Sequence, residues 1–165
     1  MEGLSYGLLE RQGYEGYLLP QAPERVLQFG EGNFLRAFAD YFIDIANEKA
    51  GFNGKVCVVQ PIASGLAEVI NSQEGLYTVY LRGYEDGERV SRKRVVSSIS
   101  RALDPYTQYE AFLDCAGNPD LRYIISNTTE AGIVFDEGST FDQTPPASFP
   151  AKLTRFLYER FEKFG

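Results

Sequence analysis

Two glycines separated by one residue stand where a short apolar stretch gives way to a helical pattern. The stretch Arg25-Val26-Leu27-Gln28-Phe29 runs into Gly30-Glu31-Gly32, and apolar residues recur at helical spacing from Asn33 onward. Glycines let the backbone approach a ligand closely, and unpaired N–H groups at a helix start attract phosphate. The pattern therefore indicates a phosphate-binding turn. A purely structural tight turn is the alternative, because Leu35 replaces the third glycine of G-x-G-x-x-G.

A second candidate position lies at the end of the next apolar stretch. Gln60 ends the expected strand Lys55-Val56-Cys57-Val58-Val59-Gln60, where an Asp or Glu commonly accepts hydrogen bonds from the ribose hydroxyls of a dinucleotide. An amide can bond a ribose but does not repel a 2′-phosphate, so this position determines the choice between NAD and NADP only weakly. A polar strand terminus is the alternative interpretation.

A third candidate is a polar run after a later strand. Ser126-Asn127-Thr128-Thr129-Glu130 follows the apolar stretch Leu121 to Ser126, at the carboxyl edge where open α/β sheets bind ligands. The run therefore predicts a ligand site. The alternative is that its Ser, Asn and Thr side chains cap the following turn.

Composition excludes several other chemistries. The 165 residues contain no histidine, which removes Ser-His and Cys-His nucleophile pairs and most transition-metal sites, so no metal is expected. A net charge of -7 disfavours nucleic-acid and anionic-membrane partners. No apolar run approaches the roughly 20 residues of a membrane span, and no secretory signal is visible. With Cys57 and Cys115 in apolar surroundings, a reduced cysteine pair and a cytoplasmic location are expected.

The elements that must position these candidates alternate between strands and helices. Strands are expected at residues 25–29, 55–60 and 121–126, a hairpin from strands 76–81 and 90–99 around Asp86-Gly87, and helices at residues 33–50, 64–72, 104–116 and 149–164. The helix after the glycine turn should start with Asn33 as its N-cap and bury one apolar face, formed by Phe34, Phe38, Tyr41, Phe42 and Ile45. Asp104-Pro105 predicts the start of the third helix. The pattern is typical of an α/β three-layer sandwich with a largely parallel sheet and one inserted β-hairpin.

Several segments together resemble the mannitol dehydrogenase family of long-chain polyol dehydrogenases. Residues 26–38 are similar to that family's G-x-G-x-F-x-R-A signature, which also lacks the third glycine. The similarity continues through residues 58–62, 75–78, 126–133 and 148–155 and covers residues 25 to 163.

The resemblance implies a metal-independent, NAD-linked oxidoreductase acting on a sugar acid or polyol. Residues 1–24 are then an N-terminal arm and residues 25–165 a Rossmann-like dinucleotide-binding domain. The C-terminal catalytic domain, with its lysine acid/base, is expected to be absent from the chain, which should bind dinucleotide weakly, turn nothing over and hold no catalytic residue. An apolar patch around Phe156, Leu157, Phe161 and Phe164 would then be left bare on the last helix.

The resemblance also assigns roles to the candidate residues. The pyrophosphate turn would be lined by Gly30, Gly32, Asn33 and Phe34, with assistance from Arg36, the adenosine end by Gln60 and Ile62, and the nicotinamide side by Asn127, Thr128 and Glu130. An ion pair within the protein is the alternative for Arg36. Another member of the family, acting on mannitol, fructuronate or mannonate, and a non-catalytic nucleotide-binding module remain alternative functions.

Overall fold

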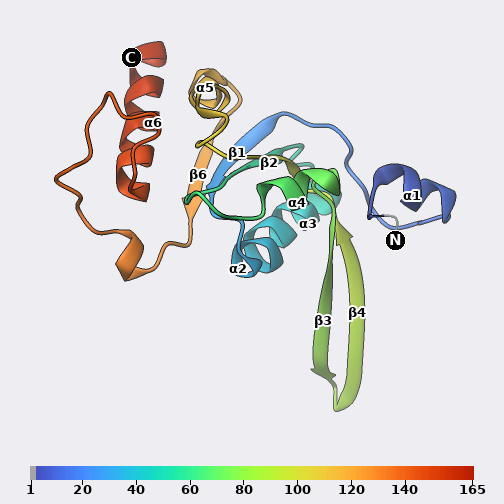
Figure 1. Cartoon of the computed structure of the whole chain (residues 1–165). Helices are drawn as coiled ribbons and strands as arrows, with labels where there is room; N and C mark the ends of the chain where they lie inside the picture. Colours follow the sequence, from blue (N-terminus) through green and yellow to red (C-terminus); the bar gives the residue numbers. More distant parts are fainter. Residues whose placement is uncertain (1–2) are drawn as a thin grey trace.

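A four-stranded parallel sheet lies at the centre of the computed structural model, which describes residues 3–165 (Figure 1). Its strands are β1 (Glu24–Phe29), β2 (Lys55–Val59), β5 (Ile99–Leu103) and β6 (Tyr123–Ser126), in the order β5-β2-β1-β6. All three neighbouring pairs are parallel. Every residue of β2 is buried, as expected for a central strand with helices on both faces.

Helices cover both faces of this sheet, so the predicted three-layer α/β fold is confirmed. On one face, α5 (Tyr109–Asp114) and α6 (Phe149–Phe164) pack through Phe112 and Phe156 onto Leu27 and Phe29. On the other face, α3 (Tyr41–Ala50) and α4 (Ala67–Ser72) pack onto Val26, Val56 and Val58. Successive residues of β1 thus point to opposite layers, which is the period-two geometry of a strand.

The N-cap of the helix after the glycine turn lies one residue earlier than predicted. Gly32 is the N-cap, with extended backbone at φ −68° and ψ 160°, and Asn33 is the first helical residue. The side chain of Asn33 accepts a hydrogen bond from Arg36 and does not cap the helix. From Asn33 the chain runs through α2 (Asn33–Leu35), one π-helical turn (Arg36–Asp40) and α3 without a break.

The predicted buried face of this helix was wrong. Phe34, Phe38 and Phe42 are 59%, 55% and 55% exposed, whereas Asp40 and Asp44 are fully buried. The polar side chains point inward because they find hydrogen-bond partners there. Asp40 accepts from Gln28, and Asp44 accepts from Arg94 and Ser97. Asn47 donates to Gly54 O. The three rings form a ladder on the outer face, with Phe34 stacked on Phe38 and Phe38 edge-on to Phe42.

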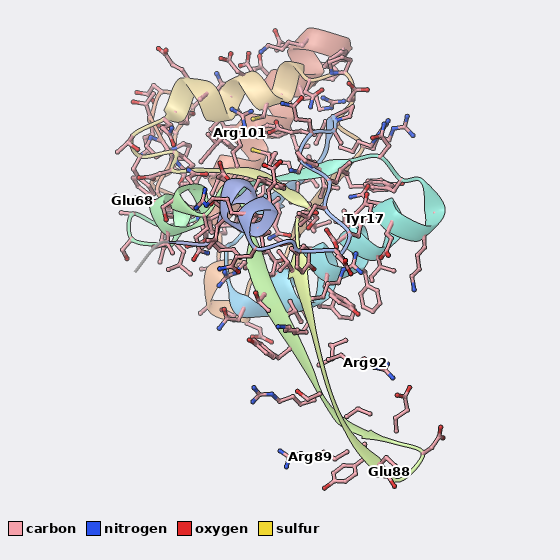
Figure 2. All side chains as sticks on the ribbon, turned by 90° about the vertical axis from the view of Figure 1, so that its right-hand side faces the viewer. Tyr17, Glu68, Glu88, Arg89, Arg92 and Arg101 are labelled. Atoms are coloured by element: carbon pink, nitrogen blue, oxygen red, sulfur yellow. The ribbon has the colours of Figure 1, made fainter. Side chains whose placement is uncertain are left out.

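The predicted hairpin is confirmed as a separate two-stranded antiparallel sheet, β3 (Tyr77–Glu85) and β4 (Glu88–Val96). Asp86 and Gly87 both have positive φ, at 52° and 83°, as a type I′ turn requires. The hairpin projects away from the sheet, with Glu88 and Arg89 near its tip (Figures 1 and 2). The expected second strand, residues 90–99, was too long: β4 ends at Val96, and β5 begins at Ile99 in the parallel sheet.

Three smaller predictions are also corrected. Asp104-Pro105 does not open α5, whose N-cap is Gln108. Asp104 instead accepts a hydrogen bond from Tyr106 N at 3.0 Å and forms a turn. The helix expected over 64–72 starts only at Ala67, and the strand expected to be buried at 121–126 is β6, a half-exposed edge strand. The last helix has the predicted bounds.

The N-terminal segment holds a short helix, α1 (Tyr6–Arg11), and packs at the base of the hairpin. Leu9 lies in a small apolar cluster with Leu76 and Val95. The ammonium group of Lys55, at the start of β2, donates to Pro20 O at 3.0 Å. Within residues 3–165 no helix is both long and apolar enough to cross a membrane.

Candidate functional site

The two glycines of the turn serve different purposes. Gly30 has φ +113°, a conformation that costs other residues strain, and its N–H donates to Val59 O at 2.9 Å. Gly32 has φ −68°, which any residue adopts, and no described heavy atom lies within 4 Å of the position a Cβ would take. The fold therefore requires a glycine at position 30, and at position 32 a glycine only leaves open space beside the backbone.

The helix start beside Gly32 offers N–H groups to a ligand. The first amides of a helix have no acceptor within it, and here the first helical bond is donated by Arg36 N to Gly32 O, at 3.3 Å. The amides of Asn33 and Phe34 precede it. Open space at Gly32 next to these amides fits the close approach of a diphosphate.

A cleft joins this turn to the end of β6. Gly30, Ile62, Asn127 and Thr128 all line it. Gly30 follows β1, Ile62 follows β2, and Asn127 and Thr128 follow β6. β1 pairs with β2 on one side and with β6 on the other, so the cleft lies where the strand order reverses. Open α/β sheets bind their ligands at this switch point.

Gln60 faces a neighbouring polar cleft, which it lines with Ser64, Gly65 and Glu68. It is buried, and its amide is used within its own loop: Nε2 donates to Ile62 O at 2.9 Å, and Oε1 accepts from Ala67 N at 3.3 Å. In this structure Gln60 orders the segment after β2.

Three other candidates, Phe34, Arg36 and Glu130, do not line the cleft that contains Gly30. Arg36 donates to Asn33 Oδ1 at 2.7 Å, and its guanidinium lies 5.4 Å from the centre of the Tyr77 ring. Phe34 presents an exposed ring at the head of the phenylalanine ladder. Glu130 is exposed and begins a 3₁₀ turn, Glu130–Gly132.

Sequence reasoning missed Glu31, the residue between the two glycines. Its side chain is 9% exposed, and Oε1 accepts from Leu66 N at 3.3 Å. A Cβ on Gly65 would collide with both Glu31 and Gln60, so the three residues are in close contact at the end of β2. A carboxylate from the glycine turn therefore lies beside the end of β2. Its position between the two glycines is visible in the sequence.

Beneath the turn, Asp40 is fully buried. Burial raises the pKa of its carboxyl group to about 7, against the lowering effects of a hydrogen bond from Gln28 and the charge of Arg36. Burial also raises the pKa of the neighbouring Tyr77, and the Asp40 charge acts in the same direction. A titratable group therefore lies under the glycine turn.

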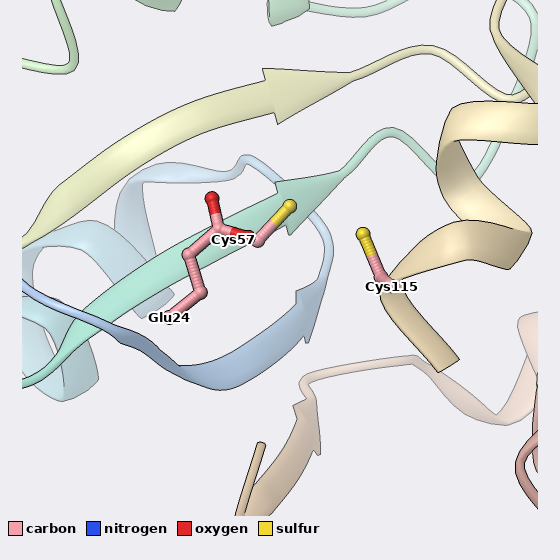
Figure 3. A group of neighbouring side chains, drawn as sticks. All are labelled: Glu24, Cys57 and Cys115. Atoms are coloured by element: carbon pink, nitrogen blue, oxygen red, sulfur yellow. The ribbon is translucent and has the colours of Figure 1, made fainter. Parts of the chain in front are cut away.

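Glu24, Cys57 and Cys115 form a second cluster, and their donor atoms lie within 4.8 Å of one another (Figure 3). Both cysteines are free and buried. Arg101 donates to both Glu24 oxygens, at 2.9 and 3.0 Å, and to Cys115 Sγ at 3.6 Å. The guanidinium already supplies this cluster with a positive charge, which disfavours a metal cation beside it.

Comparison with known proteins agrees with this geometry. A family profile described as the mannitol dehydrogenase Rossmann domain matches residues 24–165. Altronate oxidoreductases from Klebsiella pneumoniae subsp. pneumoniae and Bacillus subtilis are 48% and 49% identical, over 95% and 94% of this chain. The one from Bacteroides thetaiotaomicron is 51% identical over 88% of the chain. The chain spans about a third of the length of these curated relatives, 32%, 32% and 30%.

Two solved structures share the fold. Mannitol 2-dehydrogenase from Pseudomonas fluorescens, in a ternary complex with NAD and D-mannitol, superposes with a TM-score of 0.79 at 22% identity, over 97% of this chain and 36% of that one. D-sorbitol dehydrogenase superposes with a TM-score of 0.70 at 18% identity, over 99% and 35%. The family resemblance of the sequence is thereby confirmed, and the chain belongs to the mannitol dehydrogenase family, whose Rossmann domain it contains.

Proposed function

We propose that this chain is the NAD-binding domain of an altronate oxidoreductase, which interconverts D-altronate and D-tagaturonate. The observation that carries the proposal is the glycine turn: Gly32 leaves open space beside a helix start, at the point where the strand order reverses. Identities of 48% to 51% with altronate oxidoreductases favour this substrate pair over mannitol, since the mannitol 2-dehydrogenase is 22% identical.

The residues around the turn fit a dinucleotide. We assign Gly30, Gly32, Asn33 and Phe34 to the pyrophosphate through their backbone, with Arg36 beside them. Gln60 and Ile62 border the adenosine end, where Glu31 disfavours a 2′-phosphate and so favours NAD over NADP. Asn127, Thr128 and Glu130 border the nicotinamide side. The bound nicotinamide supplies the hydride chemistry.

Exposed apolar faces suit a further part of the protein. The phenylalanine ladder adjoins an apolar groove lined by Phe42, Phe52, Tyr123 and Ile125 at the free edge of β6. A full dinucleotide-binding sheet has the strand order 3-2-1-4-5-6, and β5-β2-β1-β6 corresponds to its first four positions. We propose that the additional chain of the longer relatives covers this edge and contributes the catalytic lysine and the sugar-acid contacts.

The outer face of α6 is also apolar. Leu157, Phe161 and Phe164 are exposed, as expected for a bare patch. Phe156 was wrongly included in that patch, because it packs against Phe112 in the core. A role in bacterial galacturonate breakdown in the cytoplasm completes the proposal.

Isothermal titration calorimetry with NAD tests the cofactor site. Gly32→Val places a side chain in the open space without backbone strain, so we expect at least about tenfold weaker NAD binding, with only the small loss of stability that a poorer N-cap causes. Gly83→Val is the matched control, since a Cβ at Gly83 also meets nothing within 4 Å but lies in β3. Equal NAD affinity in the Gly32→Val variant and the unmodified chain would contradict the proposed site.

Two further measurements separate the alternatives. The chain should produce no NADH from altronate and NAD, because the proposed catalytic lysine lies outside it, and turnover would contradict this division of labour. Clearly tighter binding of NADPH than of NADH would overturn the NAD assignment. A non-catalytic module predicts no altronate oxidation even when the additional part of a longer relative is joined to the chain.

A further inference from the structure

Two buried polar side chains meet directly below the glycine turn. Gln28 in β1 and Asp40 in the helix are both fully buried. Gln28 Nε2 donates to Asp40 Oδ2 at 3.2 Å and to Gly30 O at 3.0 Å. The remaining oxygens, Gln28 Oε1 and Asp40 Oδ1, have no hydrogen-bond partner among the residues that the structure describes.

Two unpartnered acceptors in a buried contact are costly, because neither an amide oxygen nor a carboxylate oxygen can donate. A proton on the Asp40 carboxyl group removes the problem. The neutral acid can donate from Oδ1 to Gln28 Oε1, while Gln28 Nε2 continues to donate to Oδ2. Carboxylic acid and carboxamide then form a planar pair with two hydrogen bonds, and both orphaned oxygens are satisfied.

The surroundings of Asp40 favour this neutral form. Arg36, one turn earlier on the helix, favours the charged form of Asp40. The neighbouring hydroxyl of Tyr77, from β3, does not stabilise a carboxylate at Asp40, because it donates to Arg36 O at 2.7 Å. Asp44, one turn later, is neutralised by Arg94 from β4. Burial outweighs the charge of Arg36, and the pKa of Asp40 rises to about 7.

The same pair holds the backbone of the turn. Gln28 Nε2 is shared between the Asp40 carboxyl group and the Gly30 carbonyl, and Ser98 Oγ fixes the Asp40 carbonyl at 2.8 Å. We infer that Gln28 and Asp40 are positioning residues for the dinucleotide: the neutral acid–amide pair fixes the Gly30–Gly32 turn in the shape that binds pyrophosphate. This inference rests on the proposed function.

Loss of the proton weakens dinucleotide binding for two reasons. The carboxylate faces the unpartnered Gln28 Oε1, so the bond network that orders Gly30 is disturbed. The new negative charge also lies beneath the turn that holds an anionic pyrophosphate. If only the neutral form binds, about 90% of the chain is competent one pH unit below the pKa and about 10% one unit above it.

Calorimetric titration with NAD at pH 6 and pH 8 tests the inference. We expect about tenfold weaker binding at pH 8 for the unmodified chain. Asp40→Asn keeps the shape of the neutral acid, since its amide can donate to Gln28 Oε1 at any pH. The Asp40→Asn variant should therefore bind NAD about as tightly as the unmodified chain at pH 6, and equally well at pH 8.

A second measurement needs no ligand. The carboxyl ¹³C resonance of Asp40 should titrate near pH 7 in the folded chain, well above the usual value of about 4. Because the folded state then holds a proton that the unfolded state has lost, Asp40 stabilises the fold at low pH, and this contribution falls as the pH rises from about 4 to 7. Urea unfolding at several pH values measures this dependence of the unfolding free energy on pH, and Asp40→Asn should remove it.

The outcomes distinguish this inference from the proposed function. Titration of Asp40 near pH 4 overturns the inference, and so does NAD affinity that is independent of pH, or equally dependent on pH in the Asp40→Asn variant. NAD binding itself then still supports the proposed function. Absence of NAD binding at every pH contradicts the proposed function and the positioning role together.

Discussion

The carboxylate of Asp44 joins α3 to the base of the hairpin through the guanidinium of Arg94, whose Nε lies 2.7 Å from Asp44 Oδ2. The other oxygen of Asp44 accepts from the N–H and hydroxyl of Ser97, at 2.8 and 2.9 Å. Ser97 stands where the chain leaves β4 and enters β5. One buried acid therefore fixes the crossing from the hairpin to the parallel sheet.

Asp44→Ala should be strongly destabilising. Removing one partner of a buried ion pair leaves the other charge uncompensated, which costs about 3 to 5 kcal/mol. Glu48→Ala removes the more exposed partner of the same Arg94 and should cost less than about 1 kcal/mol. Urea unfolding measures both, and similar losses in the two variants would contradict the role given to Asp44.

Glu31→Gln should relax the choice between the two dinucleotides. The variant keeps an acceptor for Leu66 N but removes the negative charge at the end of β2. We expect the affinity for NADP to rise at least about fivefold relative to that for NAD. Glu68→Gln, an exposed acid on α4 in the adjoining polar cleft, is the control. An unchanged NAD to NADP ratio in Glu31→Gln would rule out Glu31 as the discriminating acid.

Phe38 and Phe156 should respond in opposite ways to truncation. Phe38 is 55% exposed in the phenylalanine ladder, whereas Phe156 is fully buried. Phe156→Ala should cost about 3 to 5 kcal/mol, while Phe38→Ala should cost only about 1 kcal/mol, the value of an aromatic pair. Phe38→Ala should also reduce the binding of an apolar fluorescent dye. A large loss of stability in Phe38→Ala would show that the ladder belongs to the core.

The two cysteines should differ in reactivity. Their mutual hydrogen bond, followed by burial, raises the pKa of Cys57 well above its usual value. The same hydrogen bond lowers the pKa of Cys115, burial opposes this, and the charge of Arg101 adds to the lowering. Alkylation by iodoacetamide followed by peptide mass spectrometry should therefore modify Cys115 first. The alkylation rate of Cys115 should rise with a midpoint at lower pH than that of a free thiol.

Faster labelling of Cys57, or a midpoint for Cys115 at or above that of a free thiol, would contradict this order. Cys115→Ser provides the control, because it leaves Cys57 as the only thiol and should make the chain nearly unreactive while folded.

The sheet core and the last helix could be predicted because their patterns are local. β2 is an unbroken apolar run between glycine and proline, and α6 has a Ser148 N-cap, a proline at the start and regular apolar spacing. The glycine turn was placed by the same logic, since a change of period from strand to helix marks the boundary.

The reversed helix face and β5 could not be predicted, because distant partners decide them. Asp44 is buried only because Arg94 and Ser97, about fifty residues later, satisfy its oxygens. β5 carries Ser100 and Arg101 within an otherwise apolar stretch, and both donate to Glu24 at the start of β1. Hydrophobic periodicity assigns such residues to the surface, so β5 was merged with the hairpin strand.

The candidate site was predicted as three segments but not as one arrangement. The structure brings Gly30, Ile62, Asn127 and Thr128 to a single cleft. The side chain of Gln60 bonds instead within the loop that follows β2, and Glu31 lies beside the end of that strand. These differences depend on contacts made by the loop after β2, whose shape has no short-range signature.

The most direct test of the account is a backbone amide ¹H–¹⁵N titration of the chain with NAD. We expect saturable shifts that are largest at the N–H groups of residues 31–34, with smaller ones at Ile62 and at residues 127–130. Saturable NAD binding that leaves the amides of residues 31–34 unmoved, or no saturable shift at all, would contradict the claim that the glycine turn holds the pyrophosphate.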